Sequence, residues 1–179
     1  AGLQKELVSQ GCKVWGSRDG DSLEISREKF HRVLGEVGLE VPVFHRGIGL
    51  TALSEHLKDK EDKIIKLSKY RGSHETCKWR DWKTDYGMLD VWAVRFGAVK
   101  ELMPFLVFDK IDTDIELGCD TFCIDGQWPG TMIQGYEAKD AGFLSAVRPR
   151  SKMPEQVEAV LEAFGPVLAL YGYKNSFSM

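Results

Sequence analysis

The sequence is poor in the features that mark membrane, secreted and nucleic-acid-binding proteins. It has four cysteines in 179 residues, and none of its apolar runs approaches the length of a membrane span. Its 24 Lys and Arg residues are offset by 27 Asp and Glu residues, so the net charge is −3 and the pI is about 5.9. This balance leaves no excess of positive surface for nucleic acid or anionic lipid. We therefore expect a reduced, cytoplasmic protein without nucleic-acid or membrane partners.

The few cysteines do not suggest a disulfide framework or a zinc site. Cys119 and Cys123 are four residues apart, and no histidine lies near them in the sequence. In an extended segment their side chains point to the same face of a strand. We interpret them as small core residues of a strand, with zinc binding as the alternative.

Hydrophobic periodicity predicts helices in the first half of the chain and mostly strands in the second. Hydrophobic residues make up 43% of the sequence, enough for one core or for two small lobes around a cleft. This order of elements predicts an α+β fold. The predicted helices are residues 3–10, 26–37, 51–58, 84–99 and 154–172, and the predicted extended segments are 12–15, 41–45, 63–68, 105–111, 115–124, 131–138 and one that begins at 174.

Local signals mark the ends of several of these elements. Ser26 is a good N-cap for the second helix, and Gly38 suits the position after its last turn. The pair Asp125-Gly126 predicts a hairpin turn. Pro154 suits the first turn of the last helix.

Two segments have the residue types that hold a nucleotide. Lys66 lies on an apolar strand and is followed by a loop with Gly72 and Ser73, whose backbone N–H groups could approach phosphate oxygens. The alternative is a surface hairpin with a solvated lysine. The extended backbone of Asp109-Lys110-Ile111 offers an N–H and a C=O to an adenine edge, and Glu116 could accept hydrogen bonds from the ribose. The alternative here is an acidic, solvated hairpin.

Two further cations extend this hypothesis. Glu137 and Lys139 end a predicted strand and point to one face, either as a surface ion pair or with Lys139 over a triphosphate. Arg27 opens a helix, where a cation opposes the helix dipole unless an anion holds it. A solvated arginine is the alternative.

The order and spacing of these segments resemble the ATP-grasp superfamily over residues 14–179. Leu23-Glu24-Ile25-Ser26-Arg27 followed by Gly38-Leu39-Glu40-Val41-Pro42 is similar to the family's opening helix, and Lys66 with Gly72-Ser73 to its phosphate-binding strand and loop. Asp109-Lys110 through Glu116 is similar to the family's hinge, with aspartate in place of glutamate. Tyr136-Glu137-Ala138-Lys139 resembles the D-alanine–D-alanine ligase-like members, and Gly135–Gly142 with Tyr171–Lys174 resembles the phosphoribosylamine–glycine ligase-like members.

The resemblance implies two α+β lobes with mainly antiparallel sheets around a nucleotide cleft. We expect lobe 1 at residues 23–101 and lobe 2, incomplete, at 102–179, after the end of an incomplete N-terminal α/β unit at 1–22. It also implies ATP and Mg²⁺ as cofactors and a small carboxylate and an amine as substrates, joined through an acylphosphate. Arg27, Lys66 and Lys139 would meet at the phosphates, with the loop at 69–76 closing over them.

The chain departs from the family at its metal site. The family's magnesium ligands lie on strands after the last helix, which we expect beyond Met179, and Glu155, Glu158 and Glu162 are better interpreted as a solvated helix face. We expect the intact protein to be a ligase that forms a C–N bond and this sequence alone to be inactive. One alternative is a catalytically inactive nucleotide-binding or scaffold protein. Another is an unrelated interaction module whose protein-binding face includes Trp79 and Trp82.

Overall fold

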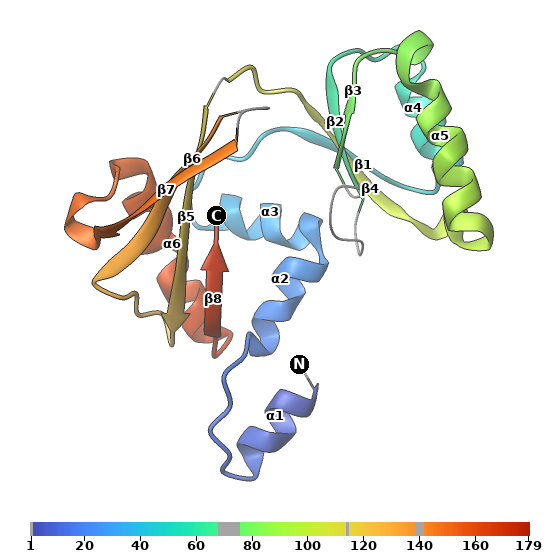
Figure 1. The fold of residues 1–179 in the computed structure, drawn as a ribbon. Coiled ribbons are helices and arrows are strands. Elements are labelled where there is room, and N and C mark those ends of the chain that lie inside the picture. The colour runs from blue at the N-terminus through green and yellow to red at the C-terminus, as the bar shows by residue number, and fades with distance from the viewer. Residues whose placement is uncertain (1, 68–75, 114, 139–141) are drawn as a thin grey trace. The chain divides into compact units, whose positions relative to one another are not determined.

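A computed structural model describes residues 2–67, 76–113, 115–138 and 142–179 (Figure 1). It confirms an α+β protein with two mainly antiparallel sheets. In the described residues no helix combines the length and the apolar character needed to cross a membrane. The helical elements are α1 (Gly2–Ser9), η1 (Arg18–Gly20), α2 (Asp21–Ile25), α3 (Arg27–Glu36), α4 (Leu50–Leu57), α5 (Trp82–Phe96), η2 (Gly97–Leu102), η3 (Arg150–Lys152) and α6 (Glu155–Leu170). The strands are β1 (Phe44–Ile48), β2 (Lys63–Leu67), β3 (Thr76–Trp79), β4 (Pro104–Asp109), β5 (Ile115–Ile124), β6 (Thr131–Ala138), β7 (Gly142–Pro149) and β8 (Lys174–Ser178).

The chain forms two compact units, each built around one sheet. The β1–β4 unit comprises residues 25–32 and 40–111, and the β5–β8 unit comprises residues 1–24, 33–39 and 112–179. These ranges differ from the expected lobes in two places. Strand β4 is hydrogen-bonded to both β1 and β2, so residues 102–111 belong with the first sheet and not with the second. Residues 1–24 cluster with the second sheet, where Gly16 forms a bridge to Lys174.

The β1–β4 unit is a four-stranded antiparallel sheet in the order β1-β4-β2-β3. Figure 1 shows α4 and α5 together on one face of this sheet. The core forms there because alternate residues of β2 and β4, including Ile65 and Val107, point to the same side and meet the apolar stripes of both helices. Asp81 caps α5 by accepting a hydrogen bond from the Thr84 N–H at 2.8 Å.

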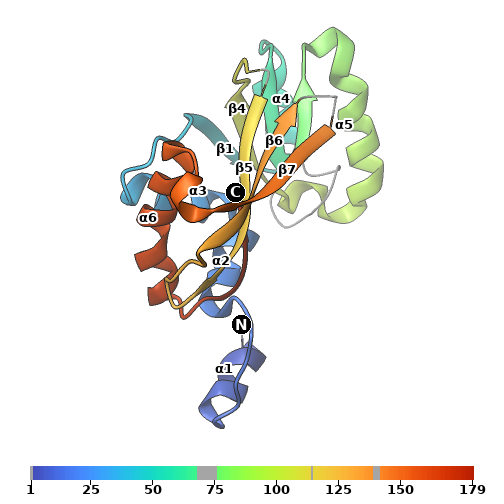
Figure 2. The ribbon, with the colours of Figure 1, turned by 60° about the vertical axis from the view of Figure 1, so that its left-hand side comes forward.

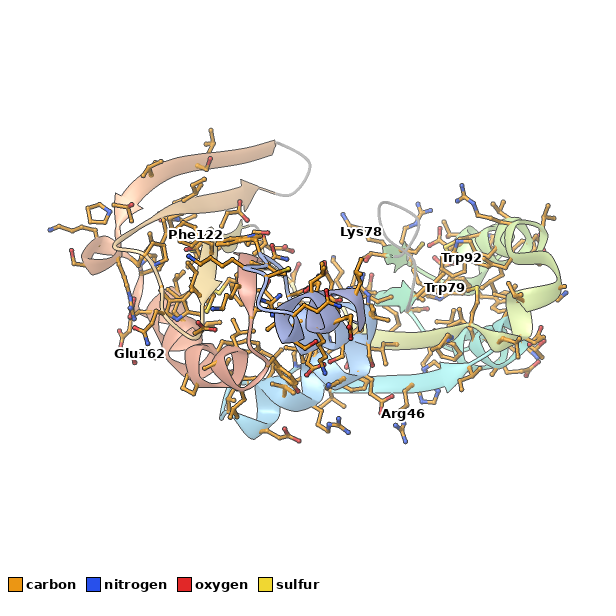
Figure 3. All side chains as sticks on the ribbon, turned by 90° about the horizontal axis from the view of Figure 1, so that it is seen from below. Arg46, Lys78, Trp79, Trp92, Phe122 and Glu162 are labelled. Carbon is orange, nitrogen blue, oxygen red and sulfur yellow. The ribbon has the colours of Figure 1, made fainter. Side chains whose placement is uncertain are left out.

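Trp79 belongs to this core and not to a protein-binding face. Its side chain is 1% exposed, and its indole N–H donates to the Lys60 carbonyl at 2.9 Å. Trp92 on α5 is also buried, and Figure 3 shows both rings between the strands and the helices of this unit. The interaction-module interpretation is therefore wrong for Trp79, because a fully buried indole offers no surface to a partner.

Helix α3 has the ends that the sequence predicts. The Ser26 hydroxyl accepts a hydrogen bond from the Lys29 N–H at 3.3 Å. At the other end Gly38 has a φ of +82°, and the next N–H, of Leu39, donates to the Leu34 carbonyl at 3.0 Å. Only glycine adopts such a φ without strain, so the chain leaves the helix here.

The β5–β8 unit is a second antiparallel sheet in the order β7-β6-β5-β8, with α6 against one face (Figure 2). Cys119 and Cys123 are buried on the α6 side with free thiols, which confirms their interpretation as core residues. Among the described residues, no group of three or more His, Cys, Asp and Glu side chains could hold a metal ion.

The Asp125-Gly126 turn also forms as predicted. Both residues have positive φ, +49° and +81°, and Ile124 and Gln127 exchange backbone hydrogen bonds of 2.9 and 3.0 Å across the turn. The turn lies directly against α6: a Cβ added at Gly126 would be 2.6 Å from the Gly165 carbonyl oxygen. Two glycines therefore allow this close contact between turn and helix.

Three sequence predictions are wrong or incomplete. Residues 12–15 form no strand, because only the single bridge from Gly16 reaches β8. Strands β3 and β7 were not predicted, because β3 has only four residues and the described side chains of β7 are exposed on both faces. Both strands are recognised by their pairing with β2 and β6. Pro154 is the N-cap of α6 and not its first residue, and Pro166 lies inside the helix.

Candidate functional site

The face of the β1–β4 sheet opposite α4 and α5 combines cationic and apolar side chains. Strand register places its residues together: Phe44 and Ile64 each pair with Phe108, and Arg46 and Lys66 each pair with Leu106. Lys78 on β3 pairs with Ile64 on the same face, and in Figure 3 it points away from the neighbouring Trp79. We call this surface the Lys66 face: Phe44, Arg46, Ile64, Lys66, Lys78, Leu106 and Phe108.

Lys66 lies on the predicted apolar strand, β2, and its side chain packs beside an aromatic ring. Its ammonium nitrogen is 5.3 Å from the centre of the Phe108 ring, within the range of a cation–π interaction. Its neighbours Ile65 and Leu67 are fully buried on the other side of the sheet. Burial of Ile65 and Leu67 therefore fixes β2 in the sheet, and Lys66 is the cation that β2 places on the opposite face.

Helix α3 adds a further cation, Arg27, and an imidazole to this face. The ring of His31 is 5.0 Å from Phe108 and 5.5 Å from Phe44, and these two phenylalanines are 5.3 Å apart. Burial, together with the positive charges of Lys66 and Arg27, holds the pKa of His31 below its usual range. Arg27 and Lys66 therefore act on the same imidazole from two different elements.

His31 was missed in the sequence, although a signal for it exists. Residues four apart on a helix lie on the same face, so Arg27 and His31 belong together as soon as α3 is recognised. The Nδ1 atom of His31 is buried and has no hydrogen-bond partner within the described ranges. A buried nitrogen without a partner is uncommon and costs free energy, which makes this residue notable.

The predicted adenine-binding segment begins at Asp109, the last residue of β4, and two of its residues form contacts within the β1–β4 unit. The Asp109 carboxylate accepts a hydrogen bond from the Lys63 ammonium at 2.5 Å. This hydrogen bond and the charge of Lys63 lower the pKa of Asp109. The Lys110 N–H donates to the Asp62 carbonyl at 3.0 Å. A purine contact by this segment therefore depends on backbone groups other than that N–H.

Glu116 belongs to the β5–β8 unit, at the start of β5. Because Cys119 and Cys123 point toward α6, the even-numbered residues of β5 point to the other side of the sheet. Glu116 is exposed on that face. Within its own unit it is thus placed on the surface that α6 leaves uncovered.

Three predicted residues, Gly72, Ser73 and Lys139, lie outside the described residues. Gly72 and Ser73 fall in the connection between β2 and β3, which are antiparallel neighbours. Lys139 directly follows β6, which ends at Ala138 as predicted, and falls in the connection to β7. Their contacts stay predictions.

A pocket of about 330 Å³ lies elsewhere, between α6 and the Asp125-Gly126 turn. It is lined by residues of the β5–β8 unit that include Trp128, Arg150 and Glu162, the last of which is labelled on α6 in Figure 3. It contains none of the predicted site residues. The described residues near this pocket, like those of the rest of the described chain, include no group of three or more His, Cys, Asp and Glu side chains that could hold a metal ion.

Solved structures with the same fold are known, although the sequence matches no protein-family model and no curated protein. Phosphoribosylamine–glycine ligase from Thermotoga maritima has a TM-score of 0.60 and 12% identity, over 88% of this chain and 44% of that one. D-alanine–D-alanine ligase from Bacillus anthracis in complex with ATP has a TM-score of 0.60 and 16% identity, over 98% and 56%. The ATP-grasp ligase PsnB with its minimal precursor has a TM-score of 0.55 and 16% identity, over 99% and 53%.

The chain thus spans about half the length of these three ligases, and at 12–16% identity the likeness concerns the fold. It extends over nearly all of this chain and includes both sheets. The two types of ligase that the sequence motifs resemble are both among the matched structures. On this evidence the chain has the ATP-grasp fold, and the expected fold class is confirmed.

Proposed function

We propose that this chain is the ATP-binding part of an ATP-dependent carboxylate–amine ligase. The observation that carries the proposal is the position of Lys66 over the Phe108 ring, at 5.3 Å, with His31 of the Arg27 helix against the same ring at 5.0 Å. Two cations from a strand and a helix, beside an apolar wall, suit the phosphates and the base of a nucleotide. The ATP complex of the D-alanine–D-alanine ligase, which shares the fold, supports the same assignment.

The reaction proposed for the intact protein has two steps. A carboxylate oxygen attacks the terminal phosphorus of ATP, so that an acylphosphate forms and ADP leaves. The amine nitrogen then attacks the acyl carbon, phosphate leaves, and the nitrogen loses a proton. Phosphoryl transfer needs mainly positioning and charge neutralisation. Lys66 and Arg27 would supply the charge, since a unit pair at about 4 Å is worth roughly 4 kcal/mol at an effective dielectric of 20.

Nucleotide binding should stabilise the chain against heat. For a Kd of about 1 mM and about 10 mM of the unreactive analogue AMP-PNP, linkage gives about 1.4 kcal/mol. That corresponds to a rise in Tm of roughly 3 to 6 °C for a domain of this size. Differential scanning fluorimetry with and without AMP-PNP measures it, with equal ionic strength from NaCl as the control. An unchanged Tm at this concentration would contradict the proposal.

We expect Glu116 to contribute to binding of the ribose and not to binding of the phosphates. We expect Glu116→Ala to weaken AMP-PNP binding about ten-fold, the effect of roughly 1.4 kcal/mol for hydrogen bonds to a charged group. The Kd of the variant for inorganic triphosphate should stay within about two-fold of that of the original chain, because a surface substitution away from the phosphates changes free energies by only about 0.5 kcal/mol. Isothermal titration calorimetry with both ligands makes the comparison. Equal losses for the two ligands would show that Glu116 does not contact the ribose.

A further inference from the structure

We infer that His31 is an additional residue of the nucleotide site, which takes up a proton when a polyphosphate binds between Lys66 and Arg27. This inference rests on the proposed function and extends it to a residue that none of the sequence motifs contains. It predicts that nucleotide affinity depends on pH through one identified imidazole.

The first support is the geometry around the ring. His31 is held on the Lys66 face by Phe44 and Phe108, with ring centres at 5.5 and 5.0 Å, and by the edge of Phe30 at 5.8 Å. Lys66 lies over the same Phe108 ring, at 5.3 Å from its centre. An aromatic cluster thus fixes the imidazole next to the cation that is proposed to bind phosphate.

The second support is electrostatic. The charged groups that act on His31 are Lys66 from β2 and Arg27 from its own helix, and both are positive. Together with burial they keep the imidazole neutral at pH 7, because a third positive charge there would be repelled and poorly solvated. The buried, unpartnered Nδ1 is consistent with a neutral ring that carries no proton on that atom.

A bound polyphosphate would reverse this balance. Its negative charges would offset the two cations that lower the proton affinity of His31, so the imidazolium would become more stable in the complex than in the free chain. The pKa of His31 would then rise on binding, and one proton would be taken up from solvent. Because binding and protonation are linked, a lower pH would strengthen nucleotide binding.

The sign and the pH range follow from this linkage. The additional affinity is fully present at pH values below the pKa of His31 in the free chain. It is lost as the pH rises through the higher pKa of the complex. Each unit by which the pKa rises corresponds to a ten-fold gain in affinity at the acidic end.

The test is an NMR titration of the four histidines in the complete chain, with and without AMP-PNP and, separately, inorganic triphosphate. We expect the pKa of His31 to rise by about one unit with either ligand, a typical response to an opposite charge nearby. His45 and His56 are internal controls, because they stack on each other with ring centres at 3.7 Å, and His45 lies on the α4 side of β1. A His74→Gln background removes the remaining histidine in the predicted phosphate loop.

Calorimetry gives the second readout. Between pH 8.5 and pH 5.5 the affinity for AMP-PNP should rise more in the original chain than in His31→Gln, by up to about ten-fold, because glutamine keeps a polar side chain that does not titrate. This comparison cancels the titration of the ligand's own phosphates. His56→Gln should behave like the original chain.

The outcomes separate this inference from the proposed function. If AMP-PNP binds and raises Tm but the pKa of His31 does not move, the role of His31 is refuted and the nucleotide site stands. If neither ligand binds at about 10 mM, where linkage predicts a clear effect, both proposals fail. Should His31→Gln not fold, the NMR titration of the original chain still decides.

Discussion

Lys66→Ala is expected to reduce the rise in Tm caused by about 10 mM AMP-PNP from roughly 3–6 °C to below about 1 °C. Lys66 is half-buried on the Lys66 face, and its ammonium nitrogen lies 5.3 Å from the centre of the Phe108 ring. A hydrogen bond between a charged side chain and a phosphate contributes about 1.5–3 kcal/mol, so its loss raises a millimolar Kd by more than ten-fold. At the same ligand concentration less than about half of the chain would then be in complex, which leaves a rise in Tm of roughly 1 °C or less.

Two variants separate the charge of Lys66 from its packing. Lys66→Met keeps a long apolar side chain on Phe108 and should lose the nucleotide effect as fully as Lys66→Ala. Lys58→Ala removes a lysine at the C-cap of α4, on the other side of the sheet, where it pairs with Glu55 at 2.7 Å. It should retain the complete rise. A Lys66→Ala chain that is still stabilised by several degrees would exclude Lys66 from the site.

Lys66→Met should also change His31 in the absence of ligand. Removing one of the two cations that lower its pKa should move that pKa upward, toward the ordinary value. The same NMR titration measures this shift. It tests the proximity of Lys66 and His31 independently of any nucleotide.

Gly126→Ala is expected to destabilise the chain by about 2–5 kcal/mol. About 1–2 kcal/mol comes from placing a side chain at a φ of +81°. A further 1–3 kcal/mol comes from overpacking, because the new Cβ would lie 2.6 Å from the Gly165 carbonyl oxygen, a backbone atom of α6 that cannot rotate away. Urea unfolding followed by tryptophan fluorescence measures the change in free energy.

Gly38→Ala is a matched control for this substitution. Gly38 has a φ of +82°, almost identical to that of Gly126, but a Cβ there would meet no atom within 4 Å. The strain of positive φ is thus common to both variants, and their difference of about 1–3 kcal/mol reports the contact with α6 alone. Equal destabilisation of the two variants would show that the turn and the helix are not in close contact.

Local signals in the sequence predicted much of the fold. The ends of α3 and the Asp125-Gly126 turn were found because they depend on a few neighbouring residues: Ser26 as a cap and glycine at positive φ. Strands β5 and β6 were predicted with their observed bounds, because each has a long alternating pattern with one buried side. Strand β7 lacks such a pattern, since its described side chains are mostly exposed, and only its pairing with β6 defines it.

Local sequence signals predicted only some residues of the candidate site. Lys66 was found because a lysine interrupts an otherwise apolar strand, and Arg27 because a cation at a helix start is unfavourable. Asp109 was interpreted as part of an adenine-binding segment. Its ion pair with Lys63 was not foreseen, because the two residues are brought together by the pairing of β4 with β2.

The order of amino acids alone thus specifies the caps, the turns and the strands with a clear buried side, since these depend on interactions between neighbours in the chain. It does not specify which strands share a sheet. Strand β4 was assigned to the second lobe, yet its apolar residues complete the core beneath α4 and α5, so it pairs with β1 and β2. Only that pairing brings Phe108 between Lys66 and His31, because the contact joins three segments that are far apart in the sequence.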